Sequence, residues 1–123
     1  MDTTETKPPT YRAQITPPNV DLPRLRAYRL DRIRGQMRAA NVAFCVIGNP
    51  ISLRYAVDCR EYQGMQARIP LMYLYIPVEG PVVFFGAQHR DYVGVDDYRA
   101  PARCNAFEGG LELADNARKF AED

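Results

Sequence analysis

The stretch that most constrains the fold is 69–86, in which two apolar runs flank a turn. The runs 71–76 and 82–85 are rich in β-branched and aromatic residues, and the segment 77–81 between them carries turn residues. This pattern predicts a β-hairpin. Neither arm alternates apolar with polar residues, and strands that are apolar on both sides are usually covered on both faces. We therefore expect the hairpin to lie in a mixed sheet between helices, in a three-layer α/β/α domain.

The first of these helices is predicted over residues 24–40. Asp21 is a candidate N-cap, Pro23 suits an early helical position, and Asn41 is a natural helix stop. Apolar residues recur at steps of three and four, which places them on one face of a helix. These residues are Leu30, Ile33, Met37 and Ala40.

Shorter elements are predicted on either side of the hairpin. Residues 42–47 form an apolar run typical of a buried strand, and Asn49 with Pro50 provides a start for a short helix over 51–55. This order of helices and strands is typical of an α/β domain. A last helix is predicted over 111–121, and because no Gly, Asn or Pro ends it, we expect the natural chain to continue.

The remaining segments are less regular. Residues 56–68 are polar and without a clean period, so we expect a short strand and a loop there. A short helix is expected over 86–92, an irregular stretch over 96–103 and a last edge strand over 102–107. The proline- and threonine-containing residues 1–22 are interpreted as a flexible lead-in to a domain that spans 23–123.

Composition excludes several classes of protein. A net charge of +1 gives no overall drive toward nucleic acid or an anionic membrane, although residues 24–38 contain six arginines. Those arginines suit phosphate contacts, but because they are scattered around the helix we favour a solvated face, partly docked on an acidic neighbour. The three cysteines are an odd number without a C-x-x-C motif, and the start of the chain is unlike a signal peptide. We therefore expect a cytoplasmic protein that does not enter membranes.

A complete active site is not expected in this chain. Its only histidine is His89, so a centre built on several histidines is excluded. No acidic residue lies inside the predicted strands, where a two-metal nuclease would need carboxylates. Arg60, Tyr62 and Arg68 are donors suited to a carboxylate, and on composition alone an ordinary solvated loop is the favoured alternative for their segment.

The order of motifs resembles the N-terminal domain of the creatinase/prolidase/aminopeptidase P family of metalloenzymes. The resemblance is carried by RAYRLDRIRGQMRAANV at 26–42, by FCVIGNPISLRYAVD at 44–58, and by the apolar hairpin that ends at Gly86. Ala56 and Val57 stand where many members have Thr-Gly. The match extends over about residues 24–121 and is a pattern of moderate specificity rather than a catalytic signature.

The resemblance implies a ribonuclease-H-like fold without nuclease activity. In such proteins a following C-terminal domain binds two divalent metal ions and performs the hydrolysis, so this chain alone would be inactive and without cofactor. The N-terminal domain of such members forms a homodimer and closes the partner subunit's active site. By position, the resemblance assigns substrate contacts across the dimer to Arg60, Tyr62 and Arg68. The parent protein would be a hydrolase of Xaa-Pro peptides, as an aminopeptidase P or Xaa-Pro dipeptidase, or of a creatine-like amidine.

Two alternatives remain at this stage. One is a freestanding binding or dimerisation module without an enzyme partner. The other is the same domain from the branch that cleaves dimethylsulfoniopropionate, which LRYAVD at 53–58 also resembles. That branch ranks lower because it tends to have an aromatic residue about where Met65 stands.

Overall fold

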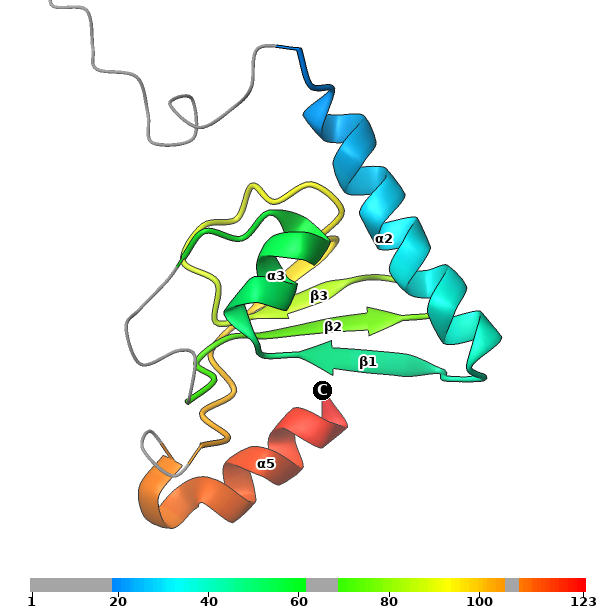
Figure 1. Ribbon diagram of the computed structural model, residues 1–123. Helices are drawn as coiled ribbons and strands as arrows, with labels where there is room; N and C mark the ends of the chain where they lie inside the picture. The colour runs from blue at the N-terminus through cyan, green and yellow to red at the C-terminus, as the bar shows by residue number, and fades with distance from the viewer. Residues whose placement is uncertain (1–18, 62–68, 106–108) are drawn as a thin grey trace, which may run out of the picture.

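The computed structural model describes residues 19–61, 69–105 and 109–123. Within these ranges the chain is mixed α/β, with three α-helices and a four-stranded open sheet (Figure 1). Its elements are α2 (Leu22–Ala39), β1 (Phe44–Ile47), α3 (Pro50–Val57), β2 (Tyr73–Pro77), β3 (Val83–Phe85), β4 (Asp97–Arg99), the short 3₁₀ helix η1 (Gly110–Glu112) and α5 (Leu113–Glu122).

Local sequence signals set the bounds of α2 and the start of α3. The Asp21 side chain accepts a hydrogen bond from the Arg24 backbone N–H, so the predicted N-cap of α2 is confirmed. At its other end Asn41 adopts a left-handed conformation (φ 56°), and the Val42 N–H bonds to the Met37 carbonyl. This is a Schellman ending. Asn49 caps α3 through two backbone N–H groups, also as predicted.

The predicted hairpin is the centre of the sheet. Strands β2 and β3 are antiparallel, with Leu74 opposite Phe84, and β1 lies antiparallel on the other side of β2. Strand β4 adds to β3 in parallel, which gives the order β1-β2-β3-β4. Gly86 ends β3 with φ 82°, and a Cβ there would lie 3.0 Å from the Leu71 carbonyl oxygen. That position therefore favours glycine.

One face of the sheet forms the core. Leu74, Ile76 and Phe84 point to this face and are fully buried beneath α2 and α3. From α2, Met37 reaches β1, where the Cys45 Sγ lies 3.8 Å from the Met37 Sδ. The apolar stripe of α2 that the sequence predicted thus packs on the sheet.

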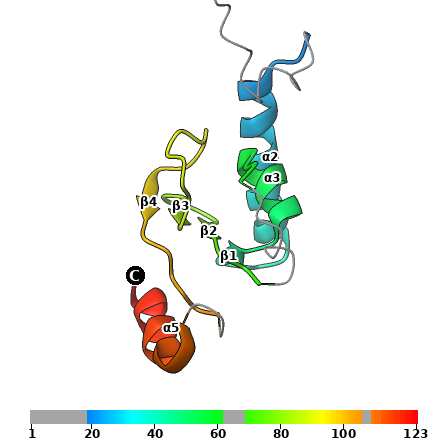
Figure 2. The same cartoon turned by 90° about the vertical axis from the view of Figure 1, so that its left-hand side faces the viewer.

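Helix α5 lies on the opposite side of the sheet from α2 and α3 (Figure 2). Its Phe120 ring contacts Tyr73 of β2 and Phe85 of β3 at centroid distances of 5.3 and 4.8 Å. Further along the same face, toward β1, Phe44 and Val46 remain 53% and 42% exposed. This face is therefore covered only in part.

Two arginines in the second half of α2 bond to the hairpin turn. Arg34 donates to the carbonyl oxygens of Pro77 and Gly80 at 3.1 and 2.6 Å, and Arg38 donates to that of Val78 at 3.3 Å. For these two arginines the partner surface is the carbonyl-rich hairpin turn, whereas Arg26 has an acidic partner, Asp58, as the sequence suggested. These bonds fix the end of α2 to the turn.

The irregular segments differ most from expectation. The edge strand is β4 at Asp97–Arg99, inside the stretch expected to be irregular, and residues 102–105 form no strand. Strand β4 forms without an apolar run, and hydrogen bonds hold its start: the Asp96 N–H donates to the Val82 carbonyl, and the Asp96 carboxylate accepts from the Val82 N–H. Residues 86–92 form a loop and no helix.

Residues 56 and 57 extend α3, and 58–61 form no strand. The rest of that predicted strand and loop, 62–68, lies outside the described residues, as does the lead-in as far as residue 18. In the part of the chain that the structure describes, no helix combines the length and apolarity that crossing a bilayer requires.

Candidate functional site

The candidate site is built around Asp58, the residue at which α3 ends. Asp58 has a left-handed backbone (φ 56°), and its N–H donates to the Arg54 carbonyl at 2.9 Å. Aspartate tolerates this conformation better than most residues, so it is a suitable helix ending. The turn directs the carboxylate back toward α2 and leaves the residue only 9% exposed.

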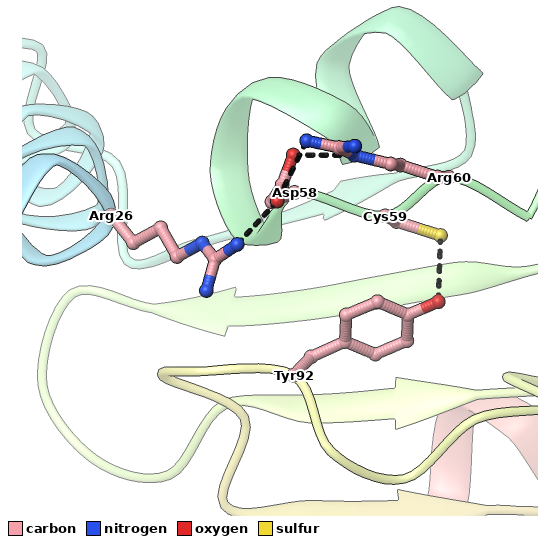
Figure 3. A network of polar contacts seen from close by, with 5 residues as sticks. All are labelled: Arg26, Asp58, Cys59, Arg60 and Tyr92. Atoms are coloured by element: carbon pink, nitrogen blue, oxygen red, sulfur yellow. Dashed lines mark hydrogen bonds and ion pairs between the residues drawn. The ribbon is translucent and has the colours of Figure 1, made fainter. Parts of the chain in front are cut away.

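Two arginines bind the Asp58 carboxylate from different parts of the chain (Figure 3). The Arg26 Nη2 of α2 lies 2.5 Å from Oδ2, and Arg60 approaches with Nε 3.2 Å from Oδ1 and Nη2 3.4 Å from Oδ2. We call these three residues the Asp58 clasp. The clasp joins α2 to the segment that follows α3.

Charge neutralisation explains the protonation state of the clasp. Burial alone would raise the pKa of the Asp58 carboxyl, but hydrogen bonds and charge attraction from Arg26 and Arg60 outweigh it and lower this pKa below its usual value. The carboxylate therefore stays ionised in the folded protein. With two guanidinium groups around one carboxylate, the clasp carries a net positive charge.

Some donor capacity in the clasp is unused within the described residues. The Arg26 Nε and Arg60 Nη1 atoms are buried and have no hydrogen-bond partner there. A cavity of about 10 Å³ lies beside Arg26 and Asp58, close to the volume that one water molecule needs. Buried guanidinium N–H groups without a partner cost free energy, so the clasp favours an additional acceptor such as a water or a carboxylate oxygen.

Glu61, directly after the clasp, forms hydrogen bonds with the loop that follows β3. Its carboxylate accepts hydrogen bonds from the backbone N–H groups of Gln88 and His89 at 2.8 and 3.0 Å, and from the Tyr92 hydroxyl at 2.6 Å. The Tyr92 ring stacks on Phe84 at 5.6 Å. Residues 58–61 are therefore held to both α2 and the sheet.

Tyr92 is the buried end of this network. It is 6% exposed, and its hydroxyl lies 3.7 Å from the Cys59 Sγ. Burial, followed by the hydrogen bond to Glu61, raises the pKa of Tyr92 far above its usual value. Tyr92 is therefore a neutral hydrogen-bond donor that positions Glu61.

Of the three residues predicted to contact substrate, Arg60 is a member of the clasp, with a side chain only 13% exposed. Tyr62 and Arg68 lie outside the described residues. The structure adds Arg26, Asp58 and Glu61, none of which was singled out as a site residue. A polar residue directly after a helix with an apolar face was the available signal for Asp58, but nothing in the sequence pairs it with a residue 32 positions away.

Across the described ranges no group of three or more His, Cys, Asp and Glu side chains is arranged to hold a metal ion. In comparisons with known proteins, no family model matches this chain and no curated protein gives a significant match. The resemblance to the creatinase/prolidase/aminopeptidase P family therefore remains a prediction.

Proposed function

We propose that this chain is the non-catalytic N-terminal domain of a creatinase/Xaa-Pro peptidase-like metallohydrolase. In this proposal the domain forms a homodimer and closes the active site of the partner subunit. The order α2, β1, α3, β2, β3 supports it, because helix, strand, short helix and hairpin follow one another as the resemblance requires. The finer fold in this proposal is the ribonuclease-H-like three-layer arrangement, with α5 as the third layer.

The observation that carries the proposal is the Asp58 clasp. The resemblance assigns substrate contacts to the stretch that begins at Arg60, and the clasp and Glu61 fix residues 58–61 to two separate elements. A contact residue that is held before the substrate arrives loses less entropy when it binds, and it orients a reacting group more accurately. Arg60 Nη1 is buried and has no hydrogen-bond partner among the described residues, and as a guanidinium donor it is suited to one oxygen of a substrate carboxylate.

Chemistry in this proposal takes place outside the chain. A C-terminal domain of the parent protein would bind two divalent metal ions and hydrolyse a C–N bond of a small Xaa-Pro peptide or an amidine. This domain would exclude water from the closed site and hold the substrate carboxylate.

The test uses the protein encoded by the full reading frame, with Arg60→Ala and Arg60→Lys variants. We expect Arg60→Ala to raise KM for an Xaa-Pro dipeptide or creatine by about tenfold or more, because removing a hydrogen bond to a charged group costs about 1.5–3 kcal/mol. Lysine should restore part of the binding through its charge, whereas Arg54→Ala, an exposed α3 control, should leave KM unchanged. Wild-type kcat and KM in Arg60→Ala would dismiss the substrate role.

The freestanding binding module is the second candidate. It is favoured by the exposed apolar side chains on β1 and α3, which include Phe44 and Ile51. A reading frame that stops directly after the codon for Asp123 would support the module, and one that continues into a domain rich in His, Asp and Glu would support the hydrolase. The dimethylsulfoniopropionate lyase-like branch is distinguished by assaying the full-length protein with that substrate.

A further inference from the structure

An apolar groove of about 370 Å³ lies between the C-terminal part of α2, Val42 and Tyr55 of α3. Ile33 and Met37 of α2 and Ala40, directly after α2, line it on one side, and Val42 and Tyr55 complete it. Arg32 and Gln36 are the two other side chains in its lining. We call this feature the α2–α3 groove.

Large apolar side chains are exposed in and beside the α2–α3 groove. Val42 is 41% exposed and Tyr55 38%. Ile51, one turn before Tyr55 on the same side of α3, is 79% exposed and continues the apolar surface beyond the groove. Apolar side chains gathered in a concave surface are typical of a protein interaction site, whereas single exposed ones are not.

The charges at the α2–α3 groove are positive. Arg32, in its lining, forms no ion pair with any described residue, unlike Arg26 in the Asp58 clasp. The Arg29 guanidinium lies 5.1 Å from the centre of the Tyr55 ring. No Asp or Glu lines the groove, and the nearest acid on α2, Asp31, occupies the next position around the helix.

We propose that the α2–α3 groove binds an amphipathic helix of a partner protein, with the apolar face of that helix in the groove and acidic residues along its flanks. The groove extends for about 10 Å along α2, from Ile33 to Ala40, a length suited to apolar residues at i, i+4 and i+7 of a second helix. Met37 is only 6% exposed, so the apolar surface that this helix would cover belongs mainly to Val42 and Tyr55. Glutamates on the flanks of that helix would meet Arg29 and Arg32. This inference is independent of the proposed function, because none of the residues that line the groove belongs to the Asp58 clasp.

Two synthetic 16-residue peptides test the inference. Both carry leucine at i, i+4, i+7 and i+11, with glutamate at every flanking position in one and lysine in the other. By fluorescence anisotropy at low salt, the full 123-residue chain should bind the glutamate peptide at least about tenfold more tightly than the lysine peptide, and the preference should shrink as salt is added.

Charge reversal locates the binding. Arg32→Glu should weaken binding of the glutamate peptide by about tenfold and strengthen binding of the lysine peptide. Arg54→Glu makes the same change at an exposed α3 position outside the groove lining and should leave the affinity for both peptides nearly unchanged. Amide chemical shifts of the wild-type chain should change at residues 32–42 and 51–55. Both substitutions are at exposed positions, and circular dichroism verifies that the variants fold.

Several outcomes would overturn the inference. No binding of the glutamate peptide, equal binding of both peptides, or shift changes centred on Phe44 and Val46 would each contradict it. A concentration-dependent dimer that Arg32→Glu abolishes would assign the groove to a second copy. Burial of Arg32 and Tyr55 by a downstream domain in the full-length protein would assign the groove to that domain.

Discussion

The two faces of the sheet are covered in different ways. On the face beneath α2 and α3, Leu74, Ile76 and Phe84 are inaccessible to solvent. On the other face, Phe120 of α5 packs on Tyr73 and Phe85 of the central strands, and Phe44 at the β1 edge is 53% exposed. Stability is therefore concentrated on the first face, while the second has apolar surface available for contacts outside the described residues.

Replacing Phe84 should produce the largest difference between the two faces. Phe84→Ala removes a fully buried ring and should lower the free energy of unfolding by about 3–5 kcal/mol. The matched change on the other face, Phe44→Ala, should cost less than about 1 kcal/mol, since much of that side chain is already in water. Urea unfolding followed by circular dichroism measures both, and equal losses would refute the contrast.

Asp58→Asn should have the next largest effect. The substitution keeps a residue that tolerates the left-handed backbone but removes the charge that neutralises Arg26 and Arg60, and it should cost about 2–4 kcal/mol. In the same urea unfolding experiment, Asp97→Asn, whose carboxylate pairs with Arg99 at the surface, is the control. A stability loss no greater in Asp58→Asn than in Asp97→Asn would show that the clasp does not stabilise the α2–α3 side.

Phe120→Ala tests the weaker face. Loss of the two ring contacts should cost about 1–2 kcal/mol and should raise amide hydrogen exchange in α5 without changing exchange in β2. Leu111→Ala, at a fully exposed position, should change neither measurement. Increased exchange throughout the sheet after Phe120→Ala would mean that the two faces do not unfold separately.

The smallest effect is expected from pH. Folding lowers the pKa of Asp58, so its ionised carboxylate stabilises the folded state. This stabilisation is complete at pH values above the unfolded-state pKa of about 4 and is lost as the pH falls through the folded-state pKa. The difference in unfolding free energy between the wild type and Asp58→Asn should therefore be constant from about pH 8 to pH 5 and should narrow below about pH 4. A difference that widens in acid would contradict the ionised clasp.

Elements with strong local signals were predictable from the sequence. Asp21, Asn41 and Asn49 mark helix ends through bonds to nearby backbone groups, and the apolar arms of the hairpin mark β2 and β3. Strand β4 was not predictable, because Asp97-Tyr98-Arg99 has no apolar run and depends on its pairing with β3. The arms also gave no sign that the two faces would be covered unequally, since both are apolar throughout.

The candidate site was predictable only in part. Arg60 was selected through its family resemblance and its suitability for a carboxylate, but its ion pair with Asp58 depends on the left-handed turn at the end of α3. The contact of Asp58 with Arg26 depends on the packing of α2, and that of Glu61 with Tyr92 on the loop after β3. Such contacts between distant segments leave no periodic pattern in the sequence.

The bonds between α2 and the hairpin turn have a kinetic consequence. Strands β3 and β4 are joined by a contact between residues only 14 positions apart, Val82 and Asp96, whereas Arg34 and Gly80 are separated by 46. Closing a longer chain segment costs more conformational entropy, and this cost comes before the contact contributes any stabilisation. Contacts between distant residues therefore tend to form late in folding. The hairpin and β4 would thus assemble first, and the arrival of α2 would complete the native state and bring Arg26 to Asp58.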